Sequence, residues 1–81
     1  METIRQVYDY LRAYNINIPI DDIWWGKTFE YGIHLAIKIE GDFENVISLM
    51  KDVNFELLFK RTATDTPIGN FTILYFRENN R

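Results

Sequence analysis

IHLAIKIE, residues 33–40, is the stretch that decides the fold of this 81-residue chain. Isoleucine or leucine stands at every odd position, and the side chains between them are His34, Ala36, Lys38 and Glu40. Successive side chains of a strand point to opposite faces, so a period of two separates a buried face from a second face. The alternation therefore predicts a strand over 33–40 whose odd positions pack against a core.

The residues before this strand predict its hairpin partner. IWWGKTF, residues 23–29, is rich in the aromatic and β-branched residues that strands favour. The connector EYG, residues 30–32, ends in Gly32, which suits a three-residue loop with a left-handed glycine. In this register Trp25 lies opposite Ile37 and shares the isoleucine face, whereas Trp24 falls on the other face. We therefore expect one indole in the core and its neighbour on the opposite side of the sheet.

Two amphipathic segments predict helices on either side of the hairpin. Residues 3–14 carry an apolar stripe with helical spacing, formed by Ile4, Val7, Tyr8, Leu11 and Tyr14. Thr3 and Gln6 have the spacing of a capping box, and Asn15 is suited to a left-handed helix end. Asp42 can cap a second helix, whose stripe is formed by Phe43, Val46, Ile47, Met50 and Val53.

A second hairpin is predicted in the last third of the chain. NFELLFKRTAT (54–64) and FTILYFRE (71–78) read as strands, joined by the turn TPIG (66–69). A three-residue loop places Thr66 opposite Asn70 and Arg61 opposite Tyr75. Strict alternation then puts residues 55, 57, 59, 61, 73 and 75 on the side that meets the helices.

The predicted order of elements is α-β-β-α-β-β within a single domain, residues 1–81. A ferredoxin-like sandwich runs β-α-β-β-α-β, and the order here resembles that fold with its first strand moved to the end. We therefore expect an α+β two-layer sandwich: a permuted ferredoxin-like, four-stranded and mostly antiparallel sheet, with both helices on one face and the other face uncovered.

The uncovered face is the predicted interaction site. By the registers above it carries Trp24, His34, Ala36, Lys38, Leu58, Lys60, Thr62, Leu74 and Phe76, a mixture more apolar than a solvated face requires. The predicted interface residues are Trp24, His34, Lys38, Leu58, Lys60, Leu74 and Phe76. Two copies packing face to face as a homodimer fit this surface as well as a foreign protein does. In the alternative interpretation, Trp24 merely covers the gap left by Gly26 and Ala36.

The composition gives little sign of catalysis or cofactor binding. Cysteine is absent and His34 is the only histidine, so neither a thiolate metal site nor a histidine-rich one is expected. His34 has no carboxylate predicted beside it. The acidic pairs at Asp21 and Asp22, and in EGDFE (40–44), lie at a strand entry and a helix cap. We expect no catalytic, metal-binding or cofactor-binding residues.

The net charge of −3 and the apolar runs, too short to span a bilayer, argue against a general nucleic-acid binder and a membrane anchor. A cytoplasmic location is the default. The sequence thus predicts a small acidic, non-catalytic protein that acts by binding a partner: an inhibitor, immunity protein or accessory subunit, phage-encoded inhibitors included. The alternatives are single-stranded nucleic acid bound on the open face, and a small-ligand regulatory module.

Overall fold

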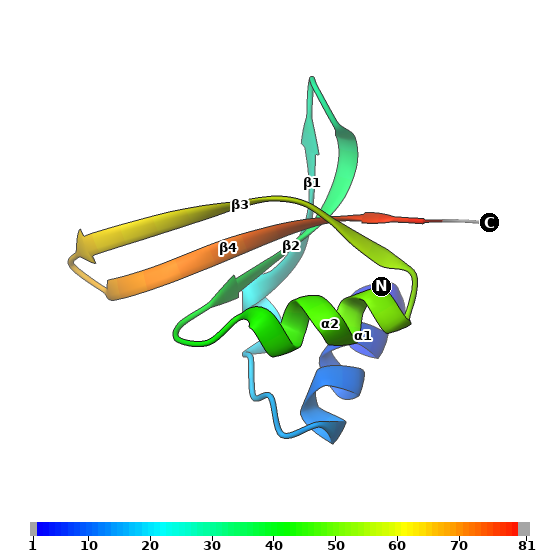
Figure 1. Ribbon diagram of the computed structural model, residues 1–81, viewed down its shortest axis with the longest axis horizontal. Helices are drawn as coiled ribbons and strands as arrows, with labels where there is room; N and C mark the ends of the chain where they lie inside the picture. The colour runs from blue at the N-terminus through cyan, green and yellow to red at the C-terminus, as the bar shows by residue number, and fades with distance from the viewer. Residues whose placement is uncertain (1, 80–81) are drawn as a thin grey trace.

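A computed structural model describes residues 2–79 and confirms the predicted order of helices and strands (Figure 1). The elements are α1 (Glu2–Ala13), a 3-10 turn η1 (Ile20–Asp22), β1 (Ile23–Thr28), β2 (Gly32–Ile39), α2 (Glu44–Asp52), β3 (Phe55–Thr66) and β4 (Gly69–Glu78).

The four strands form one antiparallel sheet in the order β1-β2-β4-β3. This order fits the permuted ferredoxin-like arrangement, and both helices lie on the same side of the sheet (Figure 1). The β1–β2 and β3–β4 hairpins project in different directions, upward and to the left in that view. The predicted α+β architecture is therefore confirmed.

The core lies between the helices and one face of the sheet. Its fully buried side chains are Leu11 from α1, Val46 and Met50 from α2, and Leu35, Ile37, Leu74 and Phe76 from β2 and β4. The hydroxyl of Tyr10 donates a hydrogen bond of 2.9 Å to the carbonyl oxygen of Leu49 and so links α1 to α2.

The helix ends match the sequence prediction in part. Asn15 has a φ of 66°, the left-handed conformation predicted for the end of α1. Asp42 Oδ1 accepts a hydrogen bond of 3.0 Å from the backbone N–H of Glu44 in the first turn of α2. The predicted end of α1 is therefore confirmed, but both predicted helix starts are wrong: Thr3 already lies within α1, and the N-cap of α2 is Phe43, one residue after Asp42.

The β1–β2 register differs from the predicted one by two residues. Trp25 lies opposite Leu35 rather than Ile37, the loop comprises residues 29–31, and Gly32 has the expected positive φ of 73°. A shift of two residues leaves every side chain on its predicted face. Trp25 accordingly packs against the core, and Trp24, opposite Ala36, lies on the other face.

The β3–β4 hairpin departs from prediction in a way that changes faces. Thr66 pairs with Gly69 across a two-residue loop, not with Asn70, and the register shifts again between Leu57 and Phe59. Leu58 is the extra residue of this β-bulge. Residues 55 and 57 therefore lie on the helix side as predicted, but Phe59 and Arg61 lie on the opposite side, because the bulge reverses the alternation.

Candidate interaction surface

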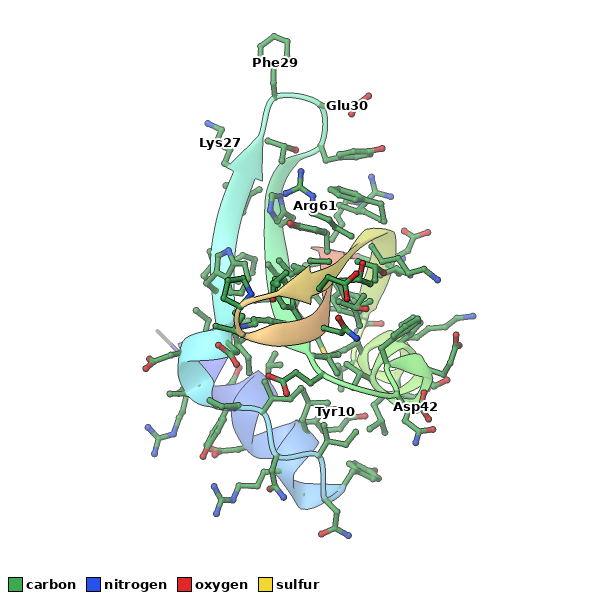
Figure 2. All side chains as sticks on the ribbon, turned by 90° about the vertical axis from the view of Figure 1, so that its left-hand side faces the viewer. Tyr10, Lys27, Phe29, Glu30, Asp42 and Arg61 are labelled. Carbon is green, nitrogen blue, oxygen red and sulfur yellow. The ribbon has the colours of Figure 1, made fainter. Side chains whose placement is uncertain are left out.

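The sheet face away from the helices, here called the open face, is defined by the strand registers. Its members are Trp24, His34, Ala36, Lys38, Glu56, Phe59, Arg61, Ala63, Phe71, Ile73, Tyr75 and Arg77, with Tyr31 joining from the β1–β2 loop. In the view of Figure 2, Arg61 lies below the loop that carries Phe29 and Glu30. Within residues 2–79, neither helix covers this face (Figure 1).

Stacked rings form the centre of the open face. Phe59 and Tyr75 stack with ring centroids 4.3 Å apart and an interplanar angle of 14°. Tyr31 contacts Phe59 at 5.3 Å, and His34 meets Tyr75 edge-on at 5.1 Å. Aromatic pairs at these distances stabilise a fold beyond the area that they bury. The rings thus come from both hairpins and fix the hairpins against each other.

His34 is buried within this ring cluster, with only 4% of its surface exposed. It lies opposite Gly26, and a Cβ added at Gly26 would come within 2.6 Å of His34 Nε2. The Nδ1 atom is buried without a hydrogen-bond partner. The β1–β2 register is uninterrupted at Gly26, and the imidazole fills the space beside this glycine.

Positive charge surrounds the rings. Among the residues that the strand registers place on the open face, Lys38, Arg61 and Arg77 are cationic and Glu56 is acidic. Glu56 Oε1 is 3.1 Å from Arg77 Nη2. Lys38 Nζ lies over the ring of Phe71, 4.8 Å from its centroid. The face is therefore locally cationic on a chain whose net charge is −3.

Only part of the predicted interface is brought together. Trp24, His34 and Lys38 share the open face, but His34 is buried rather than at the surface. Leu58 is half-buried at the bulge. These four residues stay candidates, whereas the remaining predicted members lie elsewhere.

The prediction that Lys60, Leu74 and Phe76 lie on the open face is wrong. Leu74 and Phe76 are fully buried in the core, because β4 pairs with β2 so that they share a face with Ile37 and Leu35. Lys60 pairs with Leu74 and places its Nζ 4.8 Å from the ring centroid of Phe43, beside α2. Thr62 pairs with Thr72 on this same helix side.

The residues that replace them on the open face are Phe59, Arg61, Phe71, Ile73 and Tyr75. One signal of the reversal is present in the sequence: the run Leu57-Leu58-Phe59 has three consecutive apolar residues and breaks the alternation of β3. An apolar run of this kind inside an alternating strand is compatible with a bulge.

Two hollows flank Phe55 on the helix side, with volumes of about 430 and 330 Å³. The first is lined in part by Ile47, Lys51 and Leu57, and the second by Gln6 and Val53. Across residues 2–79, no three His, Asp or Glu side chains gather as metal ligands do.

Neither α1 nor α2 is long and apolar enough to cross a membrane.

The chain was compared with family models, with curated proteins and with solved structures, and none of the three comparisons found a match.

Proposed function

We propose that this protein acts in the cytoplasm, without catalysing a reaction, by binding another protein through the open face. The observation that supports this proposal is a sheet face left uncovered by α1 and α2, with aromatic side chains at its centre and cations at its rim. Interfaces are enriched in Tyr, Trp, Phe and Arg, and these residues dominate binding energy where they cluster.

The charge of the open face selects the chemistry of the partner. Arg61 is exposed and has Lys38 on the same face, while most of the acidic residues lie elsewhere on the chain. An acidic surface with an apolar centre complements this arrangement, and opposite charges also speed association. Two open faces packed against each other would instead bring their cations together, so this face suits a foreign protein better than a second copy.

The packing of the rings favours tight binding at low entropic cost. Phe59 is held by its stack on Tyr75 and by its contact with Tyr31, so little side-chain freedom remains to be lost on binding. Trp24, at the margin of the same face, is partly exposed and available for contact. A role as an inhibitor, immunity protein or accessory subunit requires no more than such a preformed surface.

Single-stranded nucleic acid is the second candidate ligand, because proteins bind it through aromatic rings interleaved with cationic side chains. Arg61 and Lys38 beside Phe59 and Phe71 fit that description. Two contacts argue against it: Phe59 stacks on Tyr75, and Lys38 covers one face of Phe71. Bases would have to compete with these contacts for the ring faces.

The test compares three forms of the protein. Wild type, Arg61→Glu and Lys51→Glu are each used to capture proteins from an extract of the source cell, and the captured protein is then purified and titrated by calorimetry. Lys51 is exposed on α2, away from the open face, so Lys51→Glu has the same charge change without touching the site. The proposal expects equal affinity for wild type and Lys51→Glu and at least tenfold weaker binding for Arg61→Glu.

Two outcomes would contradict the proposal. If Arg61→Glu and Lys51→Glu bind the purified partner equally well, the open face is not the site. If wild type instead binds a labelled oligonucleotide with an affinity that falls steeply as salt rises, the nucleic-acid function replaces it.

A further inference from the structure

The two edges of the sheet differ in how well they are protected against pairing with another strand. β3 forms one edge, and its register is interrupted at Leu57/Phe59 and at Ala63/Thr66, where Asp65 has a positive φ of 58°. Bulges and charged side chains are the devices by which edge strands avoid further pairing. These two irregularities therefore protect the β3 edge against pairing with another strand.

β1 forms the other edge and has fewer of these devices. Its pairing with β2 runs without interruption from Ile23 to Thr28, and it contains no proline. The backbone N–H of Ile23 bonds to the carbonyl oxygen of Ile20 in η1. For Trp24–Thr28, within residues 2–79, no backbone hydrogen bond beyond the β1–β2 ladder and no side-chain hydrogen bond reaches a main-chain group. Figure 2 shows β1 at the margin of the molecule, with Lys27 pointing away from it.

Opposite charges lie at the two ends of this edge. Asp21 and Asp22 immediately precede β1, whereas Lys27 lies near its other end. Asp21 and Lys27 are both exposed, and neither takes part in a described ion pair. A copy of the same strand in the antiparallel direction places its lysine beside the two aspartates, but a parallel copy places like charges together.

We propose that β1 pairs with β1 of a second copy, antiparallel about a two-fold axis, and joins two sheets into one of eight strands. A two-fold axis perpendicular to the sheet keeps the helices of both copies on one side, so opposed residues must share a face. The register that brings Lys27 next to the turn η1 of the second copy, which contains Asp21 and Asp22, satisfies this condition. It also sets Trp24 opposite Trp24 of the second copy at the axis.

The two tryptophans explain why this register is favoured. Aromatic cross-strand pairs stabilise a sheet. Trp24 lies on the open face of β1, an edge strand that pairs with β2 on one side and, in the described sheet, with no strand on its other side. The contact is limited to one edge and is smaller than a standard interface, so the dimer is weak and depends on concentration. This inference does not rest on the proposed function, because it uses the edge of the sheet and not the cationic residues of its open face.

The test is a charge exchange followed by sedimentation equilibrium over a wide range of protein concentration. Wild type should rise in mass from 9.7 kDa towards twice that value. Lys27→Glu and Asp21→Lys should each weaken dimerisation about tenfold, because each replaces two symmetry-related attractions with repulsions. The double variant Asp21→Lys/Lys27→Glu should restore the dimer, and its net charge is again −3.

Controls separate the edge from the open face. Arg61→Glu and Lys51→Glu should dimerise as wild type does, and the circular dichroism spectra of all variants should agree. A wild type that stays monomeric overturns the proposal. A dimer that is insensitive to the single exchanges, or not restored by the double exchange, also overturns it, even if the open face still binds a partner protein.

Discussion

Replacing Gly26 by alanine perturbs the packing at the centre of the open face by a single methyl group. The added Cβ would come within 2.6 Å of Nε2, 3.2 Å of Cε1 and 3.4 Å of Cδ2 of His34. The imidazole has little space to move into, because 4% of it is exposed and its ring meets Tyr75 at 5.1 Å. Either His34 or the β1–β2 pairing must therefore shift.

The size of the effect follows from two opposing terms. In a strand without such a contact, alanine is more stable than glycine by roughly 0.5–1 kcal/mol, because glycine loses more conformational entropy on folding. Overpacking a filled site costs about 1–3 kcal/mol. We expect Gly26→Ala to lower the free energy of unfolding by about 1–2 kcal/mol, which for a chain of this size lowers Tm by roughly 5–15 °C.

The cause is tested by a double-mutant cycle with His34→Ala. Removing the imidazole opens the space above residue 26, so Gly26→Ala in this background should be neutral or stabilising by up to about 1 kcal/mol. The coupling energy between the two positions should then be at least about 1 kcal/mol. Urea denaturation of the four proteins, followed by tryptophan fluorescence, gives the four free energies of unfolding.

Two results would refute this reasoning. If Gly26→Ala leaves wild type unchanged or stabilises it, the imidazole does not occupy the space over the glycine. If the substitution destabilises equally with and without His34, the cost comes from the strand itself and not from the ring.

Three further expectations follow from the burial of particular side chains. Phe76→Ala should lower the free energy of unfolding, measured by urea denaturation, by about 3–5 kcal/mol, because Phe76 is fully buried. A much smaller loss would indicate that Phe76 lies on the open face instead. Trp25→Ala should lower the free energy of unfolding by about 2–3 kcal/mol and Trp24→Ala by less than about 1 kcal/mol, since only Trp25 packs against the core. Equal losses for the two variants would contradict the β1–β2 register. Burial, together with the nearby Tyr14 and Asp52, raises the pKa of Tyr10 from its ordinary value of 10.0. The stability gained by keeping this hydroxyl protonated is complete below pH 10.0 and is lost as pH rises through the higher folded-state pKa. The free energy of unfolding of Tyr10→Phe should therefore fall less than that of wild type above pH 10.0. If both proteins lose the same free energy of unfolding as the pH rises, this reasoning is wrong.

Most of the fold could be predicted because its determinants are local. The alternation of 33–40, the apolar stripes at helical spacing, and Asn15 and Asp42 at helix ends each act within a few residues of themselves. The indoles were also assigned to the correct faces, because the β1–β2 register was missed by two residues and such a shift preserves alternation.

The composition of the open face could not be predicted, because it depends on how β4 sits between two partners. Whether Tyr75 or Phe76 faces the helices is ambiguous in a strand that is apolar on both faces, as residues 73–76 are. The pairing of Phe76 with Leu35 resolves that ambiguity, and the bulge at Leu58 lets β3 follow β4 while still burying Phe55.

By itself the sequence determined the order of elements, the end of α1 and the parity of the first hairpin, since each depends on contacts between near neighbours in the chain. Tertiary structure alone decided which face of β4 enters the core, why residue 26 is a glycine, and that Phe59 and Tyr75 stack between the hairpins. These features need side chains that are far apart in sequence to fill one space, and only the packed sheet determines which of them meet.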